Sequence, residues 1–348
     1  STDIICIGYA FDDEDPEIWV PGKEFPESVK YHIEAGLPRS IHAHNAQFER
    51  LITKYVLPKY EKLKQPPLEA WYCTAAQARA RALPGSLGDL GACLGLVMQK
   101  DKRGEALIKK LCIPKPDGSF ENSDALMAEM YLYCLQDVRV ERAAAKATPP
   151  LSESEHRDWV ISEMVNDRGL RVDRAFAKAA MDYAEQETAE ISRQLMELTG
   201  GIITSPRQFQ RIKNFTKGLR NEDDEVMEAM TRVEKDRRTG EETTKIVCDR
   251  DARARLLELE AEQPGRLPPG IVKLIELLDE AGRSSVAKYK NMDLRAGDDD
   301  RVRGAYIFSG AGQTGRYSSV GLQVHNLPRT SPGNTEDIRQ LILGREPL

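Results

Sequence analysis

Residues 41–50 read IHAHNAQFER, and this stretch decides how the first half of the chain folds. Ser40–Ala43 is expected to be a short strand that feeds directly into a helix carrying Glu49. Strand-like runs and helical stretches alternate in the same way over residues 1–147, which predicts an α/β fold. The expected strands are Ile4–Phe11, Glu17–Val20 and Ala70–Thr74, and the expected helices include Ala75–Ala82 and Asp124–Ala147.

A second stretch, YCLQD at residues 133–137, carries a pair of side chains suited to chemistry. Tyr133 and Asp137 are one turn apart on the expected helix, so both project from one face. A carboxylate there can hold a divalent ion, and a phenol can orient an attacking water. Metal ions on carboxylates neutralise the oxygens of a reacting phosphodiester. A Tyr and an Asp at this spacing, found without other motifs, are more often a core tyrosine beside a solvated aspartate. The interpretation therefore depends on both stretches together.

Both stretches resemble motifs of the proofreading 3′–5′ exonucleases. Residues 44–49 are similar to their second motif, H-N-x-x-(F/Y)-(D/E), and residues 133–137 match their third, Y-x-x-x-D. The run LPGSLGDL at 83–90 resembles a segment between these motifs in phage-type members. The resemblance implies an RNase H-like α/β domain in which Glu49 and Asp137 are metal-site carboxylates, Tyr133 orients water and Asn45 holds the loop or substrate strand. Glu49 stands where many relatives have Asp, so the ion geometry there can differ.

The first motif of that family, D-x-E on the opening strand, is not found upstream of Asp3–Phe11. Asp12–Glu14 spells D-x-E but follows the apolar run and precedes Pro16. Acidic residues before a proline are typical of a turn, which predicts the tip of a hairpin between Ile4–Phe11 and Glu17–Val20. We therefore expect that this chain lacks the first strand of the exonuclease fold.

Near the C-terminus, residues 314–319 read TGRYSS and residues 326–329 read NLPR. A small, hydroxyl-rich loop with one Arg and one Asn can approach a sugar-phosphate backbone and reach acceptors in the minor groove. The two strings resemble the T-G-R-(L/W/Y)-S-S…N-(L/I)-P signature of family A DNA polymerases, which implies that Arg316, Ser318 and Asn326 contact primer–template DNA. Residues 284–289, SSVAKY, resemble the segment that grips the primer strand in family A thumbs, which implies that Lys288 meets a phosphate.

The prolines at Thr148–Pro150 predict a domain boundary, because proline cannot continue a helix. We expect residues 1–148 to form the RNase H-like exonuclease domain and residues 149–348 a mainly α-helical thumb with the start of the palm. Ser152 and Glu155 form a predicted capping box, and Asp173 is a predicted cap of a long helix. Residues 221–262 are expected to be a protruding insertion with a turn at 238–241. The chain stops at Leu348, ahead of the palm carboxylates that the family carries, so both ends are expected to be cut.

Composition is that of a soluble globular protein, with 348 residues, 40% hydrophobic and 30% charged. No apolar run is long enough to span a membrane. The six cysteines form no C-x-x-C pair, which favours reduced thiols in a cytosolic protein over zinc ligands or disulfides. The net charge is −6, but basic residues gather around Arg316, and phosphate contacts depend on such local charge. They are Arg283, Lys288, Lys290, Arg295, Arg301, Arg303, Arg329 and Arg339.

The resemblance implies a segment of a DNA-directed DNA polymerase for replication or repair, with a proofreading fold and Mg²⁺ at two-metal sites. Its expected partners are primer–template DNA and single-stranded 3′ ends, with dNTPs only in the complete enzyme and no membrane. The expected location is the cytoplasm of a bacterial or phage-infected cell. Because both carboxylate sets are incomplete, we expect the segment alone to be inactive. Two alternatives remain open: a stand-alone 3′–5′ exonuclease, and a non-catalytic DNA-binding half of a split polymerase that needs a second chain.

Overall fold

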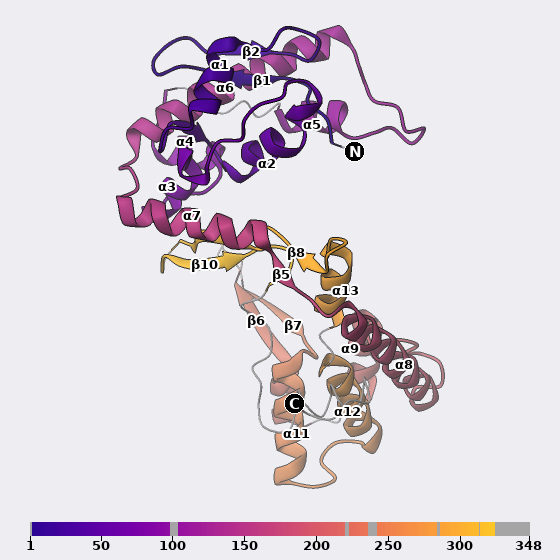
Figure 1. Ribbon diagram of the computed structural model, residues 1–348. Coiled ribbons are helices and arrows are strands. Elements are labelled where there is room, and N and C mark those ends of the chain that lie inside the picture. The colour runs from indigo at the N-terminus through magenta and orange to yellow at the C-terminus, as the bar shows by residue number, and fades with distance from the viewer. Residues whose placement is uncertain are drawn as a thin grey trace. The chain divides into compact units, whose positions relative to one another are not determined.

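The computed structural model describes residues 2–97, 104–219, 223–235, 242–283, 286–312 and 314–323. These residues divide into two compact units (Figure 1). Among the described residues, the first unit combines the chain up to Leu170 with residues 301–323, and the second holds Arg171–Asp300. The chain leaves the first unit at β5 (Leu170–Arg171) and returns to it at β8 (Arg301–Val302).

The first unit mixes helices with short strands, as the sequence predicts. Its strands form separate pairs: β1 with β2 antiparallel, β3 with β4 parallel, and β9 with β10 antiparallel. Whether these pairs belong to an RNase H-like fold stays a prediction. The strands are β1 (Ile7–Tyr9), β2 (Glu17–Trp19), β3 (Ile41–Ala43), β4 (Trp71–Cys73), β9 (Tyr306–Ala311) and β10 (Arg316–Ser319); the helices are α1 (Glu27–Ala35), α2 (Gln47–Tyr55), α3 (Thr74–Ala80), α4 (Leu87–Cys93), α5 (Gly104–Cys112), α6 (Asp124–Ala147) and α7 (Glu153–Arg168), with single 3₁₀ turns at Leu57–Lys59 and Leu68–Ala70.

The hairpin predicted around Asp12–Glu14 is confirmed, with strands shorter than expected. In β1 and β2, Ile7 lies opposite Trp19, and the turn between the strands closes through the Glu14 N–H, which donates to the Phe11 carbonyl at 2.8 Å. The carboxylate of Asp13, within this turn, is exposed and forms an ion pair with Lys146 of α6. The D-x-E string at 12–14 is therefore part of a surface turn.

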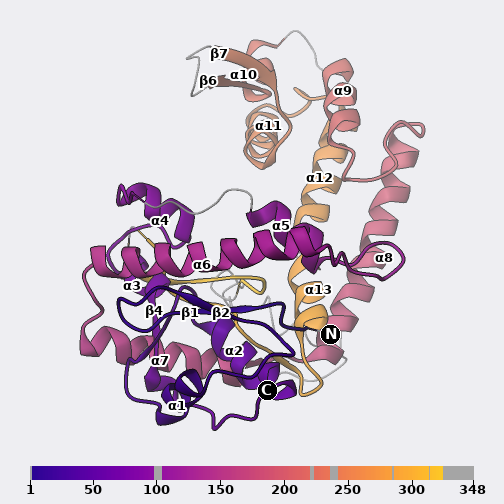
Figure 2. The ribbon, with the colours of Figure 1, turned by 90° about the horizontal axis from the view of Figure 1, so that it is seen from above.

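Helix α6 lies along β1 and β2 and contacts α3, α4 and α5 (Figure 2). Its close approach to β1 depends on Gly8. A Cβ atom at that position would lie 2.9 Å from the Cys134 sulfur and 3.1 Å from Val138. Because glycine leaves this space free, the β1 backbone can rest directly on the helix that carries Tyr133 and Asp137.

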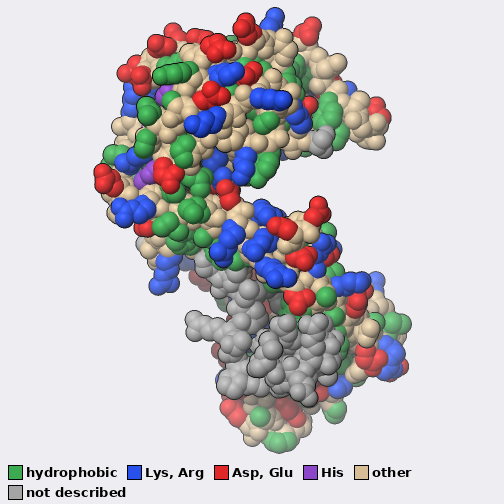
Figure 3. All heavy atoms as spheres, viewed as in Figure 1, with side chains coloured by type: hydrophobic (Ala, Val, Ile, Leu, Met, Phe, Trp, Pro, Cys, Tyr) green, Lys and Arg blue, Asp and Glu red, His purple; other side chains and the backbone are tan. Residues whose placement is uncertain are grey.

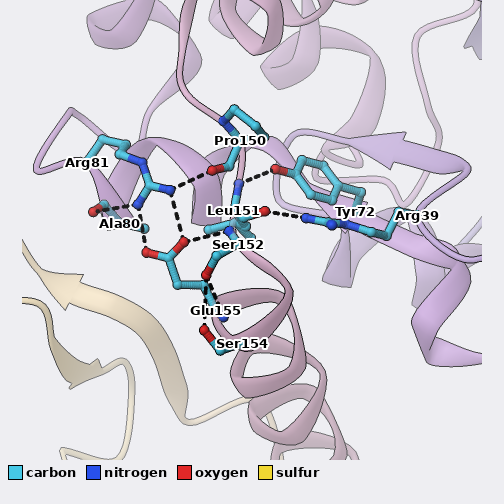
Figure 4. A network of polar contacts seen from close by, with 9 residues as sticks. All are labelled: Arg39, Tyr72, Ala80, Arg81, Pro150, Leu151, Ser152, Ser154 and Glu155. Carbon is cyan, nitrogen blue, oxygen red and sulfur yellow. Dashed lines mark hydrogen bonds and ion pairs between the residues drawn. The ribbon is translucent and has the colours of Figure 1, made fainter.

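The segment that leads into α7 is fastened to the first unit (Figure 4). The Leu151 N–H donates to the Tyr72 hydroxyl at 2.7 Å, and the Arg39 guanidinium donates to the Leu151 carbonyl. Arg81 forms two hydrogen bonds with the Glu155 carboxylate, at 2.7 and 2.9 Å. The residues around the two prolines are thus an anchored connection.

Helix α7 belongs to the first unit as well. The predicted capping box is confirmed, since the side chains of Ser152 and Glu155 each accept a backbone N–H of the other residue. Trp159 and Val160 of α7 are buried in one hydrophobic cluster with Trp71 of β4 and other first-unit residues. The boundaries of the compact units thus lie at Leu170 and Arg301. The functional domain assignment, with its boundary at residue 148, stays a prediction.

The second unit is mainly helical, as expected. Asp173 caps α8, because its Oδ1 accepts the Phe176 N–H at 2.8 Å. Strands β6 and β7 form the expected antiparallel hairpin, and its turn at 236–241 lies outside the described residues. In the described part of the chain, no helix combines the length and hydropathy needed to cross a membrane. The elements are α8 (Arg174–Leu198), α9 (Phe209–Leu219), α10 (Asp224–Ala229), β6 (Thr231–Lys235), β7 (Glu242–Ile246), α11 (Arg250–Glu262), α12 (Pro269–Arg283) and α13 (Val286–Arg295).

Candidate functional site

The turn between β3 and α2 is made by Asn45, which is exposed and has a left-handed backbone with φ of 69°. Asparagine tolerates this conformation better than most residues. Its carbonyl accepts the Phe48 N–H at 2.9 Å, which starts the helix. The strand-to-helix junction predicted from residues 41–50 is therefore confirmed, and Glu49 follows in the first turn of α2.

Glu49 is a largely buried carboxyl group with an unsatisfied oxygen. Burial raises the pKa of Glu49 to about 8, and the nearby charges of Glu141 and Cys134 raise it further, against a backbone hydrogen bond that lowers it. Its Oε2 atom has no hydrogen-bond partner within the described part of the chain. A carboxyl group in such surroundings favours its neutral form unless a cation approaches it.

The carboxyl group of Glu141 in α6 interacts electrostatically with both predicted carboxylates, Glu49 and Asp137. Burial raises the pKa of Glu141 to about 7, and the charge of Asp137 one turn earlier adds to this effect. Hydrogen bonds from the Thr74 hydroxyl, at 3.2 Å, and from the His44 backbone oppose it. Glu49 and Asp137 thus both lie within electrostatic reach of Glu141, and Oδ1 of Asp137 is buried too. Glu141 was not predicted from the sequence, although it lies four residues after Asp137 on the same helix, a spacing that places both side chains on one face.

Tyr133 lies inside an apolar cluster. Its side chain is only 8% exposed, and a Cβ atom added at Gly104 of α5 would lie 2.0 Å from its ring. Leu107, Leu111 and Met130 complete the cluster. The ring is therefore held rigidly between α5 and α6, and a role for its hydroxyl in orienting water stays a prediction.

His44 connects the turn after β3 to two other segments. Its Nδ1 lies 3.0 Å from the Thr74 hydroxyl and its Nε2 lies 3.0 Å from the Gly85 carbonyl. Gly85 belongs to the LPGSLGDL run, so this run contributes to the frame around the carboxylates. The histidine thus has a structural role at the edge of the site.

The described residues contain no group of three or more His, Cys, Asp or Glu side chains arranged to hold a metal ion. Glu49 and Asp137 would supply only part of a magnesium coordination shell. Their oxygens are nevertheless the hard donors that Mg²⁺ prefers, and Mg²⁺ commonly binds through one or two carboxylates. The unsatisfied Glu49 Oε2 fits such a cation.

The TGRYSS string forms the turn and second strand of the β9–β10 hairpin in the first unit. Arg316 is exposed and forms no ion pair with any described residue. Ser318 packs over β9, because a Cβ atom at Gly310 would lie 2.0 Å from its Oγ. The ladder is irregular between Arg316 and Ser318, and Ser309 opposite them has φ of 48°, which identifies a bulge.

The remaining predicted DNA contacts are only partly described. Lys288 lies in α13 of the second unit, and Asn326 lies outside the described residues. Over the first unit, basic and acidic side chains are interspersed on the surface seen in Figure 3.

Comparison with known proteins shows a similarity over nearly the whole chain. No family model matches the chain. Over 357 aligned residues it is 29% identical to the DNA polymerase of Bacillus phage SP02. The alignment covers 98% of this chain and 49% of that protein, so the chain spans about half the length of this relative. The similarity supports a relationship to DNA polymerases in general.

Proposed function

We propose that the chain is a segment of a family A DNA polymerase, joining a 3′–5′ exonuclease part to the thumb and the start of the palm. The observation that carries this proposal is the alignment with a phage DNA polymerase, which covers 98% of the chain at 29% identity. The order of the exonuclease-like motifs and TGRYSS supports family A. The complete enzyme would extend a primer with dNTPs, remove mispaired 3′ ends and act in the cytoplasm of an infected cell.

The strand pairs of the first unit support an RNase H-like interpretation. β1–β2 and β3–β4 lie in separate sheets, but α6 contacts β1 through Cys134 and reaches the end of β3 through Glu141. Asp137 lies between Cys134 and Glu141 on α6, so this helix carries its carboxylate between the contacts with the two strand pairs.

In this proposal, Glu49 and Asp137 hold a divalent ion, for which Mg²⁺ fits the oxygen donors. The bound ion would neutralise charge on the oxygens of a phosphodiester. The buried surroundings of Glu49 exclude water and strengthen its attraction for a cation. Tyr133 would orient the attacking water, and Asn45, exposed beside Glu49, would hold the substrate strand.

The β9–β10 hairpin would meet duplex DNA. Arg316 is exposed and has no competing ion pair among the described residues, so its charge is available to a phosphate. Ser318 and Asn326 would add polar contacts, and Lys288 of the second unit would contact the primer strand. A phosphate contact of this kind positions DNA without reading its sequence.

Metal-dependent binding of a single-stranded oligonucleotide tests the carboxylate site without requiring turnover. Fluorescence anisotropy of a 5′-labelled oligonucleotide would be compared in Mg²⁺ and in EDTA. We expect Mg²⁺ to tighten binding to the unmodified chain, and Glu49→Gln and Asp137→Asn each to remove most of that gain. Glu129→Gln, which removes an exposed carboxylate of α6, serves as the matched control. Binding that is equally strong in EDTA, or unchanged in both variants, would contradict this assignment.

A further inference from the structure

Asn166 of α7 is a buried amide that pairs with both the N–H and the carbonyl of one residue of β9, Tyr306. Its Nδ2 donates to the Tyr306 carbonyl at 2.9 Å, and its Oδ1 accepts the Tyr306 N–H at 2.9 Å. Asn166 is 3% exposed, and its backbone carbonyl also accepts the Gly304 N–H at 3.2 Å. The amide thus replaces a neighbouring strand at the point where β9 begins.

The turn of α7 that carries Asn166 is itself held by Arg50 of α2. The Arg50 guanidinium donates to Glu163 at 2.7 Å and to the two oxygens of Asp167 at 2.6 and 2.8 Å. Glu163 also lies 3.5 Å from the Asn166 Nδ2 through its other oxygen. Arg50 and Glu163 are both almost fully buried, so this cluster fixes the rotamers around Asn166.

The hydrogen bonds between Asn166 and Tyr306 fix the start of β9 and thereby position the β9–β10 hairpin. Tyr306 lies opposite Ser319 in the ladder, and the bulge lies between Ser318 and Arg316. Arg79 of α3 provides a second attachment, donating to the Phe308 carbonyl at 3.0 Å. Arg316 itself is exposed, so these attachments at the base of the hairpin decide where its guanidinium stands.

We propose that Asn166 is a positioning residue, which acts through β9 to set the orientation of Arg316 toward a nucleic-acid backbone. The inference rests on the proposed function, in which Arg316 contacts a DNA phosphate. Asn166 does not touch the DNA in this arrangement. It fixes the base of the strand pair on which Arg316 is presented.

The variant Asn166→Asp tests the hydrogen-bond pattern directly. A deprotonated carboxylate cannot donate to the Tyr306 carbonyl, whereas the neutral carboxyl can donate and accept as the amide does. The charged groups around it are Glu163 and Asp167 of α7, Arg50 of α2 and Arg303, which donates to the Asp167 carbonyl. We expect primer–template DNA to bind about tenfold more weakly to the variant at pH 8, as for the loss of one buried hydrogen bond. At pH 5 the ratio to the unmodified chain should return toward one.

A double-mutant cycle with Arg316→Ala separates positioning from general stability. If Asn166 acts through Arg316, Asn166→Asp should change DNA affinity little once Arg316 is absent, although it still lowers the melting temperature. Asn122→Asp, which adds the same charge on an exposed loop, is the control and should change neither quantity. Circular dichroism at each pH confirms that the fraction folded is equal.

The outcomes distinguish this inference from the proposed function. If Arg316→Ala weakens DNA binding but Asn166→Asp does not, the positioning role is overturned and the DNA contact stands. If the effects of the two substitutions simply add, or persist unchanged at pH 5, the positioning role is likewise overturned. If Arg316→Ala has no effect on DNA affinity, the proposed DNA contact fails first.

Discussion

At the scale of single residues, Glu49 combines a buried carboxyl group with an oxygen that has no hydrogen-bond partner among the described residues. The folded state raises its pKa to about 8, so between pH 4.5 and 8 the folded chain binds more protons than the unfolded chain. The contribution of Glu49 to stability therefore falls as the pH rises through this window. A metal-binding role requires this deprotonated form, which costs stability when no cation is present.

Glu49→Gln removes that cost. We expect the variant to be more stable than the unmodified chain in metal-free buffer, by on the order of 2 kcal/mol at pH 7, with little difference at pH 4.5. Urea unfolding at several pH values measures the difference. Glu129→Gln, at an exposed position on α6, should give no such trend. A stability difference for Glu49→Gln that is independent of pH would show that its carboxyl is not buried in neutral form.

Arg50 provides a second test at this scale, because it is a buried cation shared by two carboxylates. Arg50→Met would leave Glu163 buried without its positive partner, and we expect a loss of about 3 kcal/mol in the free energy of unfolding. Arg193→Met is the matched control, since Arg193 also bridges two carboxylates but is 56% exposed. That control should cost much less, because water screens an exposed ion pair. Equal effects of the two substitutions in urea would contradict the burial of the Arg50 cluster.

At the scale of elements, the packing of α5 against α6 depends on Gly104. A Cβ atom there would overlap the Tyr133 ring at 2.0 Å, so Gly104→Ala should force the helices apart and cost about 1–3 kcal/mol. Gly270 in α12 has open space around its Cβ position, and Gly270→Ala should stabilise the chain by up to about 1 kcal/mol. Thermal unfolding of both variants measures this contrast. A loss of stability at both positions would indicate a general intolerance of alanine instead of a specific contact.

Local features of the elements could be predicted from the sequence, whereas their packing could not. The caps at Ser152 and Asp173 depend on residues three positions apart, and both are confirmed. The turn at Asp12–Glu14 was likewise identified from neighbouring residues. The hydrogen bond of Arg50 with Glu163 joins positions 113 residues apart, and no local pattern indicates it.

The candidate site shows the same division. Glu49 and Asp137 were predicted from motifs, whereas the proximity of Glu141 to Glu49 of α2 depends on how α6 packs. The pairing of Asn166 with Tyr306 joins positions 140 residues apart, so it depends on the fold. The roles of Glu141 and Asn166 depend on which groups from distant segments lie next to their side chains. A single sequence does not indicate these neighbours.

At the scale of the whole molecule, the first compact unit is built from two stretches of the chain that are separated in sequence by the second unit. The first unit takes in α7 and the β9–β10 hairpin, so the exonuclease-like carboxylates and Arg316 occur in one compact unit. The second unit is inserted between Leu170 and Arg301 and is mainly helical. The similarity to a phage DNA polymerase runs through both units, because it covers 98% of the chain.

We propose that this molecule binds primer–template DNA as part of a polymerase. The most direct measurement is fluorescence anisotropy of a labelled, 3′-recessed primer–template between 50 and 200 mM salt, for the unmodified chain, Arg316→Ala and the control Arg193→Ala. We expect binding to weaken with salt, and Arg316→Ala to bind more weakly with a log–log slope reduced by about one unit. Arg193→Ala, whose charge is already paired with Glu190 and Glu197, should leave the slope unchanged. Binding that is absent, or a slope that is the same with and without Arg316, would contradict the claim.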